Sequence, residues 1–162
     1  MIRFSGTVWR HIPAGASALH VGYILRASGR WNRRDQYGCL YTSETKAGSI
    51  GEYRKYLESA GIEIGLKPRE VVSLEVSLKP AMDLTDEDMS PVPTDSPFLT
   101  GDDPDDFEQC RALADSLRAL EFVALIVPSA AVVGTRNIII YVDGPPSGIR
   151  LEEGSIREAI ES

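Results

Sequence analysis

The sequence predicts an α+β domain with a mixed central sheet and flanking helices. Several short apolar runs have the length and period of strands, and only a few stretches have helical spacing. The two kinds of segment do not alternate in the regular rhythm of a doubly wound sheet. The chain has 162 residues, of which 43% are hydrophobic and 25% charged, and this suits one compact domain over 1–162.

The first third of the chain predicts two strands separated by turns. Apolar alternation predicts a strand over 2–11, which Pro13 and Gly15 end. A loop with a short helix is expected over 14–25. A turn is expected over 29–32, because Gly and Asn tolerate the backbone angles of turns. The run 38–42 then predicts a short buried strand.

A helix is expected from Ser43 to Ser59. Ser43 has the side chain of an N-cap, and Gly61 is a reasonable C-terminal stop. Apolar residues recur at helical spacing within it, namely Ile50, Tyr53, Tyr56 and Leu57. On this helix Glu52 should face inward, whereas Glu58 should face solvent.

The second half of the chain predicts three strands and two helices. Strands are expected over 69–78, 122–127 and 137–142, each of them rich in Val, Ile or Leu. An amphipathic helix is expected over 107–120 and a terminal helix over 151–162.

An acidic, proline-rich segment covers 83–108. It contains eight aspartates and glutamates between Asp86 and Asp106, and no Lys or Arg occurs between Lys79 and Arg111. We expect a loop insert that is solvated, or that serves as a lid or a partner-contact segment.

Composition and charge exclude several classes of protein. Two cysteines, Cys39 and Cys110, do not make a disulfide scaffold and are expected to be buried thiols. Two histidines without a cysteine cluster do not suggest a metal site. A net charge of −7 argues against nucleic-acid and anionic-membrane binding, and no apolar run could span a membrane. A cytoplasmic protein is expected.

The charge is unevenly distributed along the chain. Every charged residue before Asp35 is an arginine, namely Arg3, Arg10, Arg26, Arg30, Arg33 and Arg34. Arginine forms planar, bidentate contacts with carboxylates and phosphates, so the front of the chain could bind a phosphate or balance the acidic remainder. The common nucleotide-binding and hydrolase motifs, such as a P-loop or GxSxG, are absent from the sequence.

Four segments, taken in order, resemble the RES domain family between about residues 5 and 145. They are Trp9-Arg10, Gly29-Arg30-Trp31-Asn32, the run 40–45 leading to Glu52, and Val127-Pro128-Ser129 followed by 136–140. The resemblance implies a fold similar to ADP-ribosyltransferase toxins and the role of toxin in a bacterial toxin–antitoxin pair. It implies consumption of NAD+ as substrate, either by degradation with water or phosphate or by transfer of ADP-ribose to a protein target. It also implies an Xre-type antitoxin that occludes the active site, and a homodimer within that complex.

The resemblance also assigns roles to residues. Arg10 and Arg30 match the family's arginines and would bind the pyrophosphate, and Glu52 matches its glutamate and would bind the ribose hydroxyls and favour the cationic transition state. The Tyr41 ring could stack on nicotinamide or belong to the core.

Further positions are expected to complete the pocket. The Ser129 hydroxyl could bond a phosphate or the ribose, but it has no nearby base that would make it a nucleophile. Trp31 and Asn32 would shape the pocket, Trp31 being equally suited to the core, and Asn137 would order the last strand. Arg33 and Arg34 match no motif and are expected to be solvated.

Two other functions remain open from sequence. One is a non-catalytic domain of the same family that binds a nucleotide or a partner, although the matched Arg, Tyr and Glu argue against it. The other is a nucleic-acid-binding domain that uses the arginine-rich front, although the net charge of −7 and the absence of lysine there argue against it.

Overall fold

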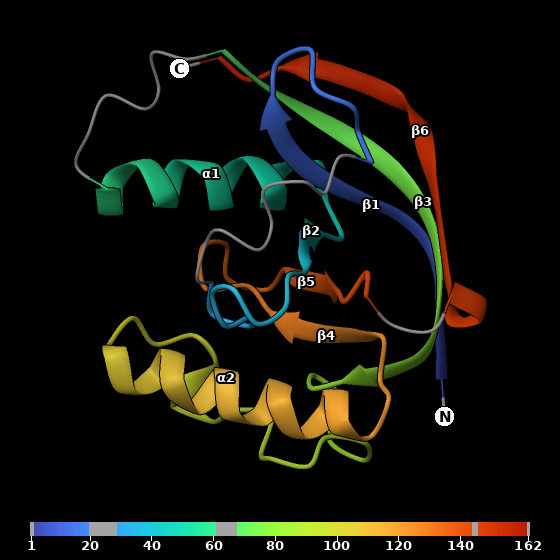
Figure 1. Ribbon diagram of the computed structural model, residues 1–162. Helices are drawn as coiled ribbons and strands as arrows, with labels where there is room; N and C mark the ends of the chain where they lie inside the picture. The colour runs from blue at the N-terminus through green and yellow to red at the C-terminus, as the bar shows by residue number, and fades with distance from the viewer. Residues whose placement is uncertain (1, 20–28, 61–67, 144–145, 162) are drawn as a thin grey trace.

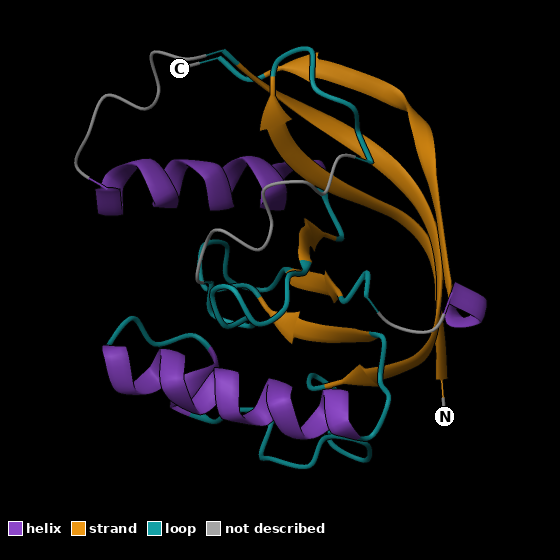
Figure 2. Cartoon of the chain, in the orientation of Figure 1, coloured by secondary structure: helices purple, strands orange, loops and turns teal. Residues whose placement is uncertain are grey.

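The computed structural model describes residues 2–19, 29–60, 68–143 and 146–161. Six strands and two helices make up most of these residues, and Figures 1 and 2 show their arrangement. In chain order the elements are β1 (Ile2–Pro13), β2 (Leu40–Ser43), α1 (Lys46–Ala60), β3 (Arg69–Asp83), the 3-10 turn η2 (Pro97–Leu99), α2 (Pro104–Ala119), β4 (Ala124–Pro128), β5 (Arg136–Ile140), the 3-10 turn η3 (Pro146–Gly148) and β6 (Ile149–Ala159).

The sheet closes on itself. Its strand order is β1-β2-β5-β4-β3-β6, and an additional pairing between β1 and β3 completes a ring of β1, β2, β5, β4 and β3. The ring closes at Ala81, which pairs with Ile2 of β1 on one side and with Ala124 of β4 on the other. All pairings are antiparallel except the one between β3 and β4.

The predicted mixed sheet with flanking helices is therefore confirmed in outline, but closure and the predominance of strands were not predicted. Closure depends on pairing between residues near 2–13 and 69–81, which lie far apart in sequence. The apolar pattern of a single strand predicts that it is buried, and it does not specify the partner strand.

Alternation along the strands of the ring separates two apolar cores. In β5, Ile138 and Ile140 point into the ring, whereas Ile139 packs on the outer face toward α2. Because both faces of β4 and of the second half of β5 are covered, these segments are continuous apolar runs rather than alternating ones. The outer core also contains Cys39 and Cys110, which are buried free thiols as expected.

The predicted terminal helix over 151–162 is wrong, because this segment forms the strand β6. It pairs antiparallel with β3 from Leu78↔Ile149 to Glu70↔Ala159, on the edge of β3 that β1 leaves open. The many Glu and Arg side chains of this segment favour a helix only weakly, and pairing with an available sheet edge overrides such a preference.

Gly154 permits the close approach of β6 to β3. A Cβ at this position would lie 2.8 Å from the backbone oxygen of Ser73, where the register of the two strands shifts. Replacing Gly154 by alanine is therefore expected to lower the free energy of unfolding by about 1–3 kcal/mol. Urea denaturation measures the effect. Ser155→Ala is the control, since Ser155 is exposed on the same strand and should change stability little.

The helices begin at other residues than predicted. Ser43 ends β2 and does not cap α1; instead the Thr45 hydroxyl oxygen accepts a hydrogen bond of 2.9 Å from the Gly48 amide. The α2 helix begins at Pro104, where Asp103 and Asp106 form a capping box. The acidic segment 83–108 is therefore not one loop, because turns, η2 and the first residues of α2 lie within it.

Some expectations fall on residues that lie outside the described ones, including 20–25 of the predicted loop and short helix, and Gly61. Residues 14–19 form turns and coil. In the described part of the chain, no helix is long and apolar enough to cross a membrane.

Candidate functional site

Glu52 lies in the middle of α1, the helix that contacts β1, β2 and β3. Its carboxylate oxygen Oε1 accepts two hydrogen bonds, one of 2.8 Å from the Ser129 hydroxyl and one of 2.7 Å from the Asn137 side-chain amide. Within the described residues no hydrogen bond reaches the other oxygen, Oε2. One oxygen of the carboxylate is thus held by two donors, whereas the other has no donor among the described residues. Glu58, on the same helix, is exposed as expected.

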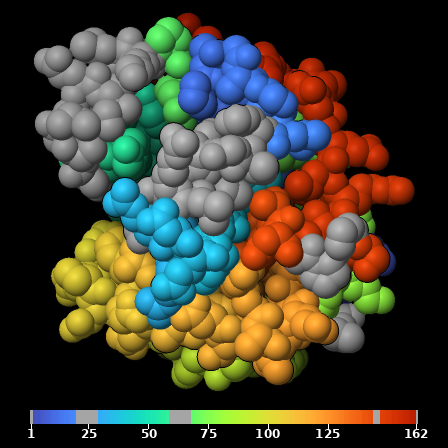
Figure 3. Space-filling model, in the orientation of Figure 1, coloured from blue at the N-terminus to red at the C-terminus, as the bar shows by residue number. Residues whose placement is uncertain are grey.

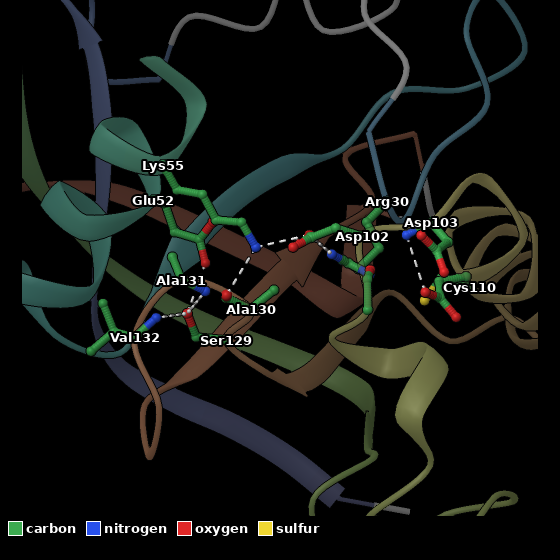
Figure 4. A network of polar contacts seen from close by, with 12 residues as sticks. Arg30, Glu52, Lys55, Asp102, Asp103, Cys110, Ser129, Ala130, Ala131 and Val132 are labelled. Carbon is green, nitrogen blue, oxygen red and sulfur yellow. Dashed lines mark hydrogen bonds and ion pairs between the residues drawn. The ribbon is translucent and has the colours of Figure 1, made fainter. Parts of the chain in front are cut away.

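Ser129 follows β4 and organises the loop after it. Its hydroxyl donates to Glu52 and accepts from the backbone amides of Ala131 and Val132, at 3.1 and 3.0 Å (Figure 4). The side chain is buried. Its hydroxyl donates one hydrogen bond and accepts two, which is all that a hydroxyl can form. In this structure the Ser129 hydroxyl therefore orients the Glu52 carboxylate and the loop after β4.

Gly51 allows this loop to approach α1. A Cβ at position 51 would collide with the Val132 side chain. A helix former would be the ordinary choice inside a helix, so the glycine next to Glu52 is explained by the close contact with the loop that carries Ser129.

Asn137 is the second group that holds Glu52. It lies at the start of β5, paired with Ser43 of β2 and Val127 of β4. Its amide nitrogen donates to Glu52, whereas its buried oxygen Oδ1 has no hydrogen-bond partner among the residues that the structure describes. The sequence suggested that Asn137 orders the last strand, and the structure adds that it orients the candidate carboxylate.

Tyr41 lies on the same outer face of the sheet. It pairs with Ile139, so Asn137 is its diagonal neighbour across the two strands, at about 7–8 Å for such pairs. The residue is 40% exposed, while its hydroxyl donates to Asn32 Oδ1 at 2.7 Å and accepts from the Trp31 amide at 2.8 Å. Burial of this end raises the pKa of the Tyr41 phenol well above its ordinary value. Tyr41 is therefore neutral, with an accessible ring.

The turn 29–32 fits closely around that hydroxyl. Asn32 Oδ1 also accepts a bond of 2.9 Å from the Gly29 amide, and Gly29 and Asn32 form an isolated bridge, which confirms the predicted turn. Trp31 is 2% exposed in the outer core, and Asn32 is buried too. Both residues thus belong to a buried, hydrogen-bonded turn, and neither side chain is exposed.

Gly29→Ala tests this turn. A Cβ there would lie 2.8 Å from Asn32 Oδ1 and would also collide with the Tyr41 hydroxyl. We expect a loss of about 1–3 kcal/mol in the free energy of unfolding, because a buried hydrogen-bonded network must open. Thermal denaturation measures the change. An equal stability of variant and wild type would contradict the close packing of the turn.

The turn is also fastened to α2. Arg33 was expected to be solvated, but it forms ion pairs with Glu108 and Asp115 at 2.8 and 2.7 Å. In the space-filling view the residues after Gly29, in cyan, lie directly against α2, in yellow and orange (Figure 3). Arg34 remains exposed, as expected.

Arg30 points from the turn toward the acidic segment. Its Nη1 donates to the backbone oxygen of Gly101 at 2.5 Å, and its Nη2 forms an ion pair with Asp102 at 3.3 Å. Its guanidinium also lies 4.5 Å from the centre of the Phe107 ring. Arg30 therefore anchors this segment beside the candidate site.

Lys55 joins the same carboxylate from α1. Its ammonium donates to Asp102 at 2.9 Å and to the backbone oxygen of Ala130 at 3.0 Å (Figure 4). Lys55 lowers the pKa of Asp102 by a hydrogen bond, with a smaller effect from the charge of Arg30. A continuous polar network thus extends from Arg30 through Asp102 and Lys55 to the loop that carries Ser129.

Arg10 lies on a different face. It shares the inner face of β1 with Val8 and Ile12, and its Nη1 donates to the backbone oxygen of Ala18 at 2.8 Å. No ion pair joins it to Glu52 among the described residues. The structure thus brings Glu52, Ser129, Asn137 and Tyr41 to one face, with Arg30 nearby, and places Arg10 in the ring interior.

Lys55 and Asp102 were not predicted as site residues. Lys55 follows Glu52 by three positions, and residues at this spacing share one face of a helix, which is the signal that could have identified it. Asp102 belonged to a run of acidic residues in which nothing in sequence distinguished one member. Within the described residues, no group of three or more His, Cys, Asp or Glu side chains is arranged to hold a metal ion.

These side chains can bind a ligand that carries a sugar and stabilise positive charge on that sugar. Glu52 supplies a fixed negative charge with a free oxygen, the Tyr41 ring supplies a flat apolar surface, and Arg30 and Lys55 supply positive charge nearby. Such a combination suits a ligand with a sugar, a flat ring and an anionic group.

The sequence matches a known protein family and a relative of that kind. The family model for the RES domain matches residues 7–159. A Mycobacterium tuberculosis protein named "Probable NAD(+) phosphorylase Rv3189" is 27% identical over 154 residues, which are 94% of this chain and 72% of that protein.

A solved structure shares the fold. A chain in the crystal structure of the M. tuberculosis MbcT-MbcA toxin-antitoxin complex matches with a TM-score of 0.74 and 20% identity, over 98% of this chain and 86% of that chain. The likeness covers the strands and both helices, and at this identity it is a likeness of fold.

Proposed function

The chain belongs to the RES domain family, and from this membership we propose that it is the toxin of a toxin–antitoxin pair and cleaves NAD+ between nicotinamide and ribose. The observation that carries the proposal is the Glu52 carboxylate, held through Oε1 by Ser129 and Asn137 with Oε2 open. The named activity of the 27%-identical relative supports the choice of substrate.

The chemistry explains why a fixed carboxylate is needed. As nicotinamide leaves, positive charge develops on the ribose, as in glycoside cleavage. A carboxylate placed in advance stabilises that charge without any reorganisation during the reaction. Ser129 and Asn137 act on the reaction through Glu52, so they are positioning residues.

Other residues would contact the nicotinamide ring and the pyrophosphate. The accessible ring of Tyr41 would stack on nicotinamide, and its hydroxyl would stay bonded to the turn 29–32. Of the two arginines expected to bind the pyrophosphate, Arg30 is the better placed. Arg10 is buried in the ring interior, where it donates to the Ala18 carbonyl. We assign it a structural role, which is to hold the segment around Ala18 against β1.

We favour degradation of NAD+ by phosphorolysis over transfer of ADP-ribose to a protein target. In this reaction a phosphate oxygen bonds to the ribose carbon while the carbon–nitrogen bond breaks, and neutral nicotinamide leaves with the electron pair. The name of the relative supports this branch. Transfer to a protein, and hydrolysis by water, are the alternatives that product analysis separates.

The partner in this proposal is an antitoxin that occludes the site. The fold shared with a chain of a toxin–antitoxin complex supports it. The Xre type of that antitoxin, a homodimer within the complex and a cytoplasmic location are parts of the same proposal.

Product analysis tests the proposed reaction. Purified protein is incubated with NAD+ with and without inorganic phosphate, and the products are identified by mass spectrometry. We expect nicotinamide and ADP-ribose 1-phosphate in equal amounts, at a rate that depends on phosphate concentration. Free ADP-ribose at an unchanged rate would indicate hydrolysis. NAD+ that stays intact under both conditions would contradict the proposal.

A further inference from the structure

One carboxylate oxygen in this protein bridges two cations from different parts of the chain. Asp102 Oδ1 lies 3.3 Å from Arg30 Nη2 and 2.9 Å from Lys55 Nζ (Figure 4). The side chain of Asp102 is 62% exposed, whereas those of Arg30 and Lys55 are 11% and 30% exposed. One largely buried and one half-buried cation thus converge on a point that an exposed anion occupies.

Both cations have anchors that do not depend on Asp102. Arg30 is held through Nη1 by the Gly101 carbonyl, and the Phe107 ring lies against its guanidinium. Lys55 is held by the Ala130 carbonyl. If the Asp102 side chain turned away, the two positive charges would stay in place with neutral partners and no counterion between them. Such a preformed pair of donors suits a phosphoryl oxyanion, which accepts several charge-assisted hydrogen bonds.

The pair lies beside the candidate carboxylate. Lys55 is three residues beyond Glu52 on α1, and Ala130 is adjacent to Ser129, which bonds Glu52. A phosphoryl group between Arg30 and Lys55 would therefore be near a ribose bound at Glu52. Both a phosphate that attacks the ribose and the pyrophosphate of the dinucleotide have this chemistry.

We propose that Arg30 and Lys55 form a phosphoryl-binding subsite and that Asp102 is its internal occupant, displaced when the phosphoryl group binds. Asp102 then competes with the substrate's anionic group and weakens its binding. Lys55 is a substrate-binding residue in this scheme. The use of the subsite during turnover rests on the proposed function, whereas the binding of an anion to it does not.

Because the Asp102 side chain is exposed, a phosphoryl group can replace it between Arg30 and Lys55. Ion pairs with an exposed partner are weak, and a phosphate carries more charge and more acceptor oxygens than one carboxylate. The alternative is that Asp102 only fastens the acidic segment to α1. The two cases differ in what removal of the negative charge does to anion affinity.

Titration with inorganic phosphate separates these cases. Asp102→Asn keeps an acceptor oxygen but removes the competing charge, and we expect it to bind phosphate about tenfold more tightly than the wild type. Asp95→Asn is the matched control, because Asp95 is exposed in the same acidic segment and makes no ion pair among the described residues. An equal affinity of Asp102→Asn and wild type, or an equal gain in both variants, would overturn the proposal.

A second pair of variants tests the cation. Lys55→Gln should lower the phosphate affinity about tenfold, since a charge-assisted bond is lost. Arg54→Gln removes the same charge from an exposed neighbouring position of α1 and should leave the affinity within about twofold of the wild type. A similar loss in both variants would indicate a general charge effect and would contradict the subsite.

A competition arm distinguishes the source of the phosphoryl group. If the subsite takes the pyrophosphate of the dinucleotide, saturating ADP-ribose should abolish phosphate binding. If it takes free phosphate as the reactant, phosphate and ADP-ribose should bind together, and either result supports the subsite.

The phosphate titration requires no turnover. Protein that binds phosphate as expected but leaves NAD+ intact would contradict only the proposed function. Protein that cleaves NAD+ while Asp102→Asn has no effect on phosphate affinity would contradict only this inference.

Discussion

Replacing Glu52 by glutamine is expected to lower the rate of NAD+ cleavage by about 10²- to 10³-fold, as the loss of one preorganised electrostatic contact does in other enzymes. Glutamine retains an oxygen that can accept the bonds of Ser129 and Asn137, so the side chain keeps its orientation. What is lost is the negative charge that opposes the developing positive charge on the ribose. The rate of nicotinamide release measures the effect.

Glu58→Gln provides the matched control. Glu58 lies on the same helix and is exposed, so its replacement removes the same charge without touching the site. It should cleave NAD+ at the wild-type rate. A Glu52→Gln variant that folds, as judged by circular dichroism, and keeps the wild-type rate would exclude Glu52 from the reaction.

Acid is expected to destabilise the protein through His11. The imidazole lies between β1 and α1, with its ring centre 5.1 Å from that of Tyr53, which follows Glu52 on the helix. Its Nδ1 is 2.7 Å from Arg69 Nη2, and because arginine only donates, Nδ1 must be unprotonated. Burial, followed by the charges of Arg69 and Arg10, lowers the pKa of His11 from 6.5 to about 3.

The sign of the effect follows from this lowered pKa. Above pH 6.5 the imidazole is neutral in both folded and unfolded chains, so His11 gives no pH dependence. Below that pH the unfolded chain binds a proton that the folded one does not, and stability falls as the pH falls toward 3. We expect a loss of about 2 kcal/mol between pH 7 and pH 5, where most carboxylates are still ionised.

Urea denaturation across that interval measures the loss. His11→Gln can still accept the Arg69 bond but does not titrate, so its stability should be nearly independent of pH between 7 and 5. A wild-type stability that stays constant over the interval, or an equal slope in the variant, would contradict a neutral, half-buried His11.

Local sequence patterns predicted the parts of the fold that depend on neighbours along the chain. The turn 29–32 and the strands near Leu74 and Ile139 follow from residue preferences and apolar periodicity. The segment 151–162 could not be assigned in this way, because its strand exists only through pairing with β3. Closure of the ring at Ala81 depends on long-range pairing of the same kind.

In the candidate site, too, some features were expected from the sequence and others depend on long-range packing. Glu52 and Tyr41 were expected from the family resemblance, and the structure connects them through Asn137, which bonds Glu52 of α1 and shares a sheet face with Tyr41. The roles of Ser129 and Asn137 as partners of Glu52 depend on how α1 packs against the ends of β4 and β5, which no motif specifies. Arg10 and Arg30 matched the resemblance equally well, yet the strand alternation of β1 turns Arg10 into the ring.

The proposed reaction requires that the ribose of NAD+ binds at the Glu52 carboxylate. A crystal structure of the Glu52→Gln variant with NAD+ tests it most directly, because slow cleavage should preserve the dinucleotide. We expect the nicotinamide ribose within hydrogen-bonding distance of the side chain at position 52, with the nicotinamide against the Tyr41 ring. A dinucleotide bound elsewhere, with the cluster of position 52, Ser129 and Asn137 empty, would contradict it.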